Sequence, residues 1–257
     1  MDISGILNAV FRWLHVIAGI LWIGHLWFFN YVNIPFAAKM KEAGASKTVV
    51  PELMPRALFW FRWGAAWTWI TGVLLLMLVF YHGGALFEGE STWGAGAIVA
   101  LLLVFGAPFI YDAIFKSPLA GNVRVAYSVC FALVVAVTLL MVYWAEFSYR
   151  GYVIHVGAMF GTIMAYNVWF RIWPSQQKII SAVKAGEAPD AAIVALAGAR
   201  SRHNTYMSVP LLWTMINQHT AVTAFSSWGY IGLFVVILLG WHLVFQLYKK
   251  SLQLQGF

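Results

Sequence analysis

The sequence predicts an all-α fold: a polytopic bundle of about seven transmembrane helices in a single integral-membrane domain, residues 1–257. Composition is the first reason, because 62% of the residues are hydrophobic and 10% are charged, whereas soluble domains carry about 25% charged residues. The second reason is a series of apolar runs that are each long enough to cross a bilayer. The third is that positive charge is concentrated in alternate connections between these runs, as expected of a multi-pass protein.

The apolar runs give the expected helices. A transmembrane helix needs about 20 predominantly apolar residues. Runs of that length fall at residues 6–30, 60–82, 94–115, 123–147, 151–173, 203–223 and 226–248. Residues 35–55, which contain several prolines, are expected to form a partly amphipathic surface segment. Residues 174–202 form the only sizeable polar loop, in which SQQKIISAVKAG predicts a short helix.

The charges set the expected topology. Of the 16 Lys and Arg residues, all except Arg12 and Arg150 lie beside alternate connections or after the last run. The positive-inside rule then places the N-terminus outside, and loop 174–202 and the C-terminus in the cytoplasm, of a bacterial inner membrane. This distribution explains the net charge of +7 without nucleic acid. The first run is long enough to span, so we expect no cleavable signal peptide.

The first two helices carry polar residues at defined heights. Residues 6–30 contain Arg12 and His15 one turn apart, with His25 about 15 Å further along the helix. Residues 60–82 open with a cluster typical of an interfacial anchor: Trp60, Arg62, Trp63 and Trp67.

The middle helices differ in their polar content. Residues 94–115 end in an acid–base pair that we interpret as structural, and residues 123–147 are almost wholly apolar. Residues 151–173 follow Arg150 and carry His155, then Gly157 and Gly161. The G-x-x-x-G spacing indicates close helix packing, although it would also let a flat ligand approach the backbone.

The last two helices complete the set of histidines. The block HNTYMSVPLLWTMINQH, residues 203–219, has Pro210 in its middle and His203 and His219 at its ends, roughly 24 Å apart. Residues 226–248 carry His242 near their inner end. Ionisable residues within membrane spans are costly, and so each is a candidate functional residue.

Threading the helices with the N-terminus outside predicts two layers of histidines. His15, His155 and His219 fall in the outer layer, beside the two outer cations Arg12 and Arg150. Imidazole is an axial haem ligand, and arginine pairs with carboxylates such as haem propionates. We therefore predict a haem b whose iron is held by two of these three histidines. The alternatives are hydrogen-bonded structural histidines and arginines that extend to the interface.

A second haem is possible on the inner side. His25, His203 and His242 fall in that layer, and two of them could hold it. His203 could instead be a capping residue, since its helix is expected to begin there. Cys130 is the single cysteine and the chain has no C-x-x-C-H, which excludes a covalently attached c-type haem.

Three stretches resemble a known family. These are RWLHVIAGILWIG, HVGAMFGTIMAYNVWFRIWPSQQKII and RSRHNTYMSVPLLWTMINQH. They are similar to the membrane region of bacterial membrane-bound urate oxidases (urate hydroxylases). The resemblance implies a membrane domain that oxidises urate and delivers electrons to cytochrome c. Full-length members add a further helix and a C-terminal cytochrome c domain, which this sequence lacks, so we expect electrons to leave to a separate partner.

Three functions remain open from the sequence. The first is a membrane haem b oxidoreductase or electron-transfer protein, for which Arg202, Asn204, Tyr206 and Asn217 could contact a purine. These residues could equally cap helices or bond between them. The second is an accessory or structural subunit of a larger respiratory complex. The third is a transporter, which a proline-broken polar helix would suit.

Overall fold

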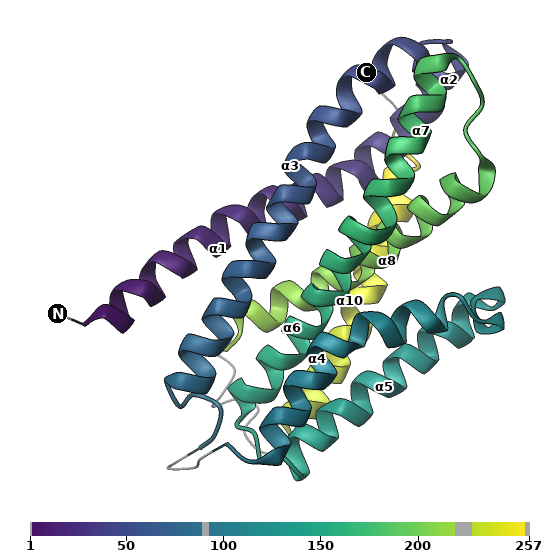
Figure 1. The fold of residues 1–257 in the computed structure, drawn as a ribbon. Helices are drawn as coiled ribbons and strands as arrows, with labels where there is room; N and C mark the ends of the chain where they lie inside the picture. The colour runs from purple at the N-terminus through teal and green to yellow at the C-terminus, as the bar shows by residue number, and fades with distance from the viewer. Residues whose placement is uncertain (1, 89–92, 219–227, 255–257) are drawn as a thin grey trace. The chain divides into compact units, whose positions relative to one another are not determined.

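The computed structural model describes residues 2–88, 93–218 and 228–254, and within them the chain is helical without a strand (Figure 1). The helices are α1 (Ile3–Trp27), η1 (Phe28–Asn33), α2 (Ile34–Glu42), α3 (Ser46–Leu75), η2 (Leu76–His82), α4 (Ala95–Ile114), η3 (Pro118–Gly121), α5 (Val123–Tyr143), α6 (Tyr149–Asn167), η4 (Val168–Ile172), α7 (Trp173–Ala185), α8 (Ala191–Ile216) and α10 (Gly229–Ser251).

Six helical runs in the described residues are long and apolar enough to cross a membrane. They are Ile3–Glu42, Ser46–His82, Ala95–Ile114, Val123–Tyr143, Tyr149–Ala185 and Gly229–Ser251. The predicted all-α membrane bundle is therefore confirmed, and the protein is a multi-pass membrane protein.

The helix expected at residues 203–223 has different limits. It corresponds to α8, which begins at Ala191, includes Pro210 and ends at Ile216. The residues before position 203 are less apolar but alanine-rich, and alanine favours helix, so the helix extends well beyond the apolar run. The last five predicted residues, 219–223, lie outside the described part of the chain.

Three membrane runs are interrupted by π-helical turns. The turns of the helix are wider in η1, η2 and η4. The α-helix resumes after η1 and η4, whereas η2 is the end of its run. These three runs are 37 to 40 residues long, or about 55 to 60 Å, which exceeds the ~30 Å apolar core of a bilayer. The predicted surface segment 35–55 is therefore largely α2 and the start of α3. The predicted short helix in loop 174–202 is α7, which continues α6 through η4.

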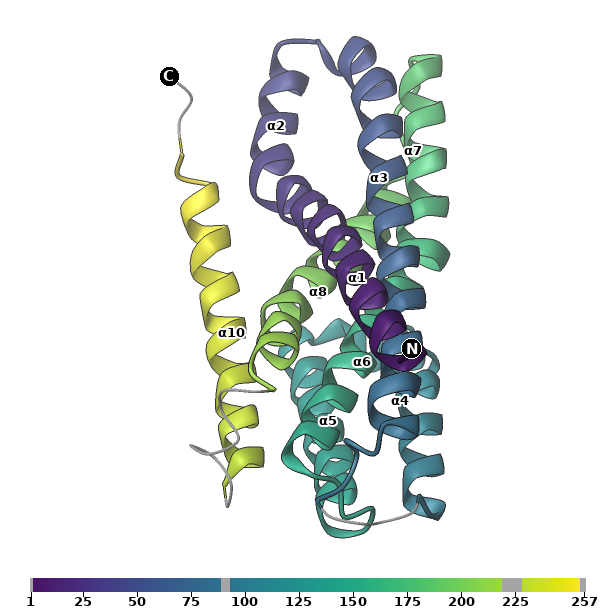
Figure 2. The same ribbon diagram turned by 90° about the vertical axis from the view of Figure 1, so that its left-hand side faces the viewer.

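The chain divides into two compact units, each assembled from separate stretches. The first comprises residues 1–11, 72–163 and 210–239; the second comprises residues 12–71, 164–209 and 240–257. In the first unit, α4 and α5 form a hairpin connected through η3 (Figure 1). In the second unit, α3 and α7 run side by side (Figure 2), and the Lys47 side chain reaches Gly186 at the end of α7.

Close backbone contacts fix the packing within each unit. In the second unit, a Cβ on Gly64 would lie 3.0 Å from Trp22 N and 3.2 Å from Ala18 O, so α1 and α3 touch backbone to backbone. In the first unit, a Cβ on Gly157 would collide with Thr214 of α8. The packing interpretation of Gly157 is thus confirmed. A Cβ on Gly161 would meet nothing within 4 Å in the described residues, so this glycine makes no comparable contact.

Candidate functional site

His15 is held in one tautomer by Thr71. The Thr71 hydroxyl donates to Trp67 O at 2.6 Å, so its lone pairs are left to accept the Nδ1–H of His15 at 3.0 Å. With the proton on Nδ1, the lone pair of the neutral imidazole is on Nε2. The imidazole also forms a hydrogen bond with the Thr68 backbone carbonyl. A metal-binding histidine is commonly prepared in this way, with one nitrogen hydrogen-bonded and the other presented.

The packing of α1 on α3 places these two side chains together. His15, Ala18 and Trp22 lie three and four residues apart on one face of α1. Gly64 and Thr71 are two turns apart on the facing surface of α3, where the glycine lets the helices approach. The helices are antiparallel here, so the Trp22–Gly64 contact and the His15–Thr71 contact lie at successive levels along the same interface. The buried Trp22 side chain, 1% exposed, anchors this arrangement.

His155 has a different environment. Its side chain is completely buried in α6, its Nδ1–H donates to Gly151 O at 2.7 Å, and its Nε2 lies 2.9 Å from the Tyr81 hydroxyl. The Tyr81 hydroxyl also lies 3.1 Å from Ala97 O. Both ring nitrogens of His155 are therefore used by the protein. Iron could bind Nε2 only if the Tyr81 hydroxyl moved away.

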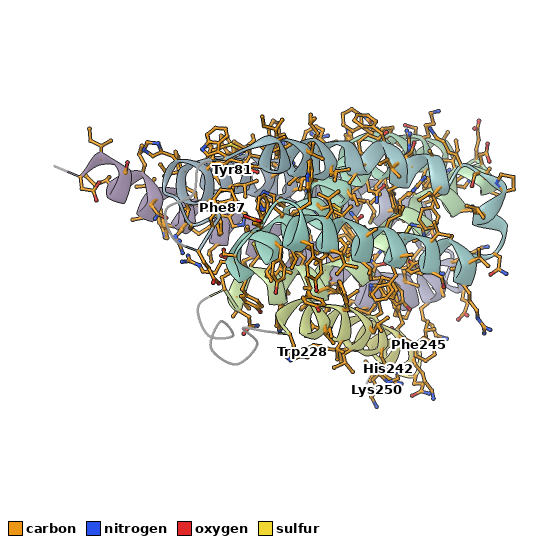
Figure 3. The ribbon with its side chains drawn as sticks, turned by 90° about the horizontal axis from the view of Figure 1, so that it is seen from below. Tyr81, Phe87, Trp228, His242, Phe245 and Lys250 are labelled. Carbon is orange, nitrogen blue, oxygen red and sulfur yellow. The ribbon has the colours of Figure 1, made fainter. Side chains whose placement is uncertain are left out.

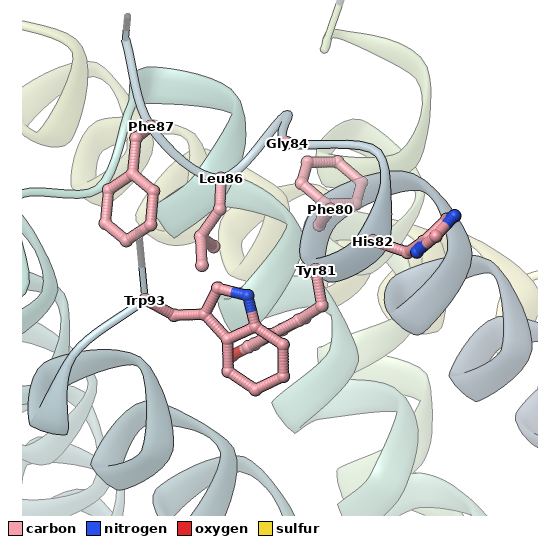
Figure 4. A pocket seen from close by; sticks show the side chains of 7 residues that line it. All are labelled: Phe80, Tyr81, His82, Gly84, Leu86, Phe87 and Trp93. Atoms are coloured by element: carbon pink, nitrogen blue, oxygen red, sulfur yellow. The ribbon is translucent and has the colours of Figure 1, made fainter. Parts of the chain in front are cut away.

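A cavity of about 360 Å³ adjoins Tyr81. Its walls come from the end of η2 and the connection that follows: Phe80, Tyr81, His82, Gly84, Leu86, Phe87 and Trp93 (Figure 4). The Trp93 ring meets Tyr81 edge to face, with ring centroids 5.4 Å apart. The cavity is therefore aromatic on several sides, and its size suits a small molecule.

The connection that forms this cavity is pinned to α6. Ser148 N donates to Leu86 O at 2.9 Å, and the Ser148 hydroxyl donates to Ala85 O at 3.2 Å. A Cβ on Gly151 would lie 2.5 Å from Leu86 O, so only glycine permits this approach. Since Gly151 also accepts the His155 hydrogen bond, the cavity wall and the buried imidazole are positioned by the same turn of α6.

The two predicted propionate partners have separate surroundings. The Arg150 guanidinium carbon lies 5.9 Å from the centre of the Phe80 ring, which also lines the cavity. Arg12 is exposed on α1. Their pairing with haem propionates stays a prediction.

The three inner-side histidines have different surroundings, and a second haem held by two of them stays a prediction. His25 donates from Nδ1 to Leu21 O at 2.6 Å, within its own helix. His242 is exposed on α10 and points away from the helix with Phe245 (Figure 3); its Nε2 lies 3.2 Å from the Gln246 amide nitrogen. His203 is half-buried in the interior of α8, so the capping interpretation is wrong. The capping prediction failed because α8 begins twelve residues earlier, at Ala191.

The predicted histidine set is only partly described. His219 lies outside the described residues. His15 belongs to the second compact unit and His155 to the first, and each unit is described by itself. Among residues 2–88, 93–218 and 228–254, no three His, Cys, Asp or Glu side chains gather as a metal site. The sharing of an iron by two histidines therefore stays a prediction.

Asn204, a suggested purine contact, is a structural residue. It is completely buried, accepts from Asn167 Nδ2 at 2.9 Å and donates to Met164 O at 2.9 Å. The interhelical hydrogen bonding that the sequence left as an alternative is thus confirmed for this residue. A second buried amide, Asn30, donates to Ser201 Oγ at 2.8 Å and accepts from the Tyr248 hydroxyl at 2.7 Å.

Three residues with key hydrogen bonds, Asn30, Thr71 and Tyr81, were not among the candidates predicted from the sequence. Asn30 is an amide in a run of aromatic residues, where an uncompensated polar group would be costly. Thr71 and Tyr81 are residue types common in membrane helices, so nothing in the sequence marks them as hydrogen-bond partners of His15 and His155. Their relation to His15 and His155 depends on helix register, which no single helix encodes.

A comparison with protein families shows which family the chain belongs to. The model of the family described as "Urate oxidase N-terminal" matches residues 44–254, most of the chain. The chain belongs to this family. Comparisons with curated proteins and with solved structures found no match. The urate oxidase N-terminal match covers His155, His203 and the 203–219 block, whereas His15 and the RWLHVIAGILWIG stretch precede it.

Proposed function

We propose that this urate-oxidase-like membrane protein is a haem b oxidoreductase that oxidises a urate-like purine and passes electrons to a cytochrome c. The observation that carries the proposal is His15, whose Nδ1 is committed to Thr71 and whose Nε2 is presented. Bound haem would supply a one-electron redox centre within the bilayer.

His15 fits an axial ligand better than His155 does. Its hydrogen bond with Thr71 is made through Nδ1, and the tautomer that this bond favours leaves the Nε2 lone pair for iron. Binding at His155 would first break the hydrogen bond with Tyr81. Among the three predicted ligands, we therefore favour His15 over His155.

The aromatic cavity is the best candidate for the purine. A flat ring of that size can stack on Trp93 or Phe87, and the volume of about 360 Å³ exceeds that of a bicyclic heterocycle. Asn204 is buried and has its hydrogen bonds satisfied, so it is no longer a candidate contact.

The test is reduction of bound haem by urate in the purified full chain. The proposal predicts a Soret band whose reduced form appears on adding urate, and a raised KM in Trp93→Ala with haem content unchanged. Haem without urate-dependent reduction would indicate another substrate. Purification only together with other subunits would favour the accessory-subunit function. A chain without any bound chromophore would refute the haem proposal.

A further inference from the structure

Arg62 is surrounded by aromatic rings from three helices. Its guanidinium carbon lies 4.0 Å from the centre of the Trp173 ring, 5.8 Å from Phe59 and 5.9 Å from Trp169. Phe59 comes from α3, Trp169 from η4 and Trp173 from α7, all within the second unit. The 4.0 Å distance is that of a guanidinium stacked on the indole face.

Despite this packing, Arg62 has no hydrogen-bond acceptor in the described residues. A guanidinium carries five N–H donors and no acceptor. The Arg62 Nε is buried without a partner, and the side chain forms no ion pair among the residues described. The rings attract the charge but offer no conventional acceptor for its N–H groups. Leaving such donors unsatisfied near a membrane is costly.

Neighbouring arginines contrast with Arg62. Arg56 forms an exposed ion pair with Glu52, with 2.7 Å between Nη1 and the carboxylate oxygen. Arg171 donates to Phe170 O at 3.0 Å and to the Tyr166 hydroxyl at 3.2 Å. The protein therefore supplies acceptors to these two cations but none to Arg62 within the described chain.

The position of Arg62 indicates what supplies the acceptor. The run Ser46–His82 has 37 residues and is about 55 Å long. With a ~30 Å apolar core, roughly its first 16 residues extend beyond the core on the side predicted to be cytoplasmic. Arg62 follows directly after them. Trp60, Trp63 and Trp67 are 52%, 40% and 55% exposed on the same helix, as expected of indoles at the lipid headgroups.

We propose that Arg62 and Trp173 form a binding site for the phosphodiester of an anionic phospholipid in the cytoplasmic leaflet. The Trp173 ring covers one face of the Arg62 guanidinium. The N–H groups at the edge of the guanidinium are then available to donate to two phosphate oxygens in bidentate geometry. The charge of Arg62 is not neutralised by a described carboxylate, which favours a lipid of net negative charge. This site does not depend on haem or on urate.

The test is lipid retention by the full chain, measured by native mass spectrometry from detergent with added phosphatidylglycerol or phosphatidylethanolamine. We expect phosphatidylglycerol to bind more tightly. Arg62→Gln should weaken its binding about tenfold, and Arg62→Lys, which keeps charge but loses the planar fork, by a smaller factor. Arg56→Gln is the matched control and should leave binding unchanged.

Further arms keep the test decisive. Trp173→Leu should weaken phosphatidylglycerol binding with Arg62 intact. This variant tests the same site if Arg62→Gln folds poorly. Inorganic phosphate should not compete, and full competition would assign the site to a free anion instead of a lipid. Equal retention of the two lipids, or equal retention by the native chain, Arg62→Lys and Trp173→Leu, would overturn the inference.

Discussion

His15 Nδ1 lies 3.0 Å from Thr71 Oγ1, and the Thr71 hydroxyl proton is committed to Trp67 O. This pair joins α1 and α3 and favours the tautomer in which the lone pair of the imidazole is on Nε2. A solvent-facing histidine would exchange between tautomers and rotate. Here the orientation is set before any ligand arrives, which lowers the free-energy cost of binding iron.

Thr71→Val should lower haem affinity about 10- to 100-fold, because valine matches threonine in shape but cannot accept the His15 N–H. The haem dissociation constant would be measured by titrating haem into the apoprotein, together with the midpoint potential. Thr71→Ser keeps the hydroxyl and should retain near-native affinity. Equal affinities for the valine and serine variants would show that the hydrogen bond has no positioning role.

Gly64→Ala should lower the free energy of unfolding by about 1–3 kcal/mol, because the added methyl would press on the α1 backbone. Thermal unfolding followed by circular dichroism in detergent measures the effect. Gly106→Ala is the matched control, since a Cβ there meets nothing within 4 Å in the described residues. An unchanged Tm in Gly64→Ala would mean that the two helices can separate at no cost.

His155→Ala should destabilise the protein and spare most of the haem, because His155 is engaged with Gly151 and Tyr81. Losing these buried hydrogen bonds and the imidazole is expected to cost about 2–4 kcal/mol. Tyr81→Phe should cause a smaller loss. Haem content and unfolding are measured on the same samples. Complete loss of haem in a stably folded His155→Ala variant would make His155 a ligand.

Asn204→Leu should lower stability by about 1–2 kcal/mol, because two interhelical hydrogen bonds disappear. The KM for urate should stay near its native value, as expected of a residue that does not contact substrate. Gln246→Ala, on the exposed face of α10, controls for general effects of substitution. A raised KM with unchanged stability would indicate that Asn204 contacts the substrate.

The sequence predicted the fold class well, and the reasons are physical. Apolar length and charge alternation are local quantities, so the membrane helices and the short helix within 174–202 could be found from them. The limits of α8 could not, because its first half is less apolar than a membrane span and its helicity comes from alanine. Contacts such as His15–Thr71 depend on the crossing of two helices at Gly64, which hydropathy does not encode.

The histidines illustrate the same division. Their occurrence within apolar runs made them candidates, and the sequence separated an outer layer from an inner one but could not rank the histidines within the outer layer. The structure distinguishes His15, whose Nδ1 bonds Thr71, from His155, with both nitrogens engaged, and from His242, exposed on α10. The differences between His15 and His155 arise from their neighbours on other helices, Thr71 and Tyr81.

Pyridine haemochrome quantification of the purified chain, with His15→Ala and His242→Ala alongside, tests whether His15 binds haem. We expect bound haem b in the native protein, loss of that haem in His15→Ala, and native haem content in His242→Ala. Absence of haem from the native chain, or native haem content in a folded His15→Ala variant, would contradict it.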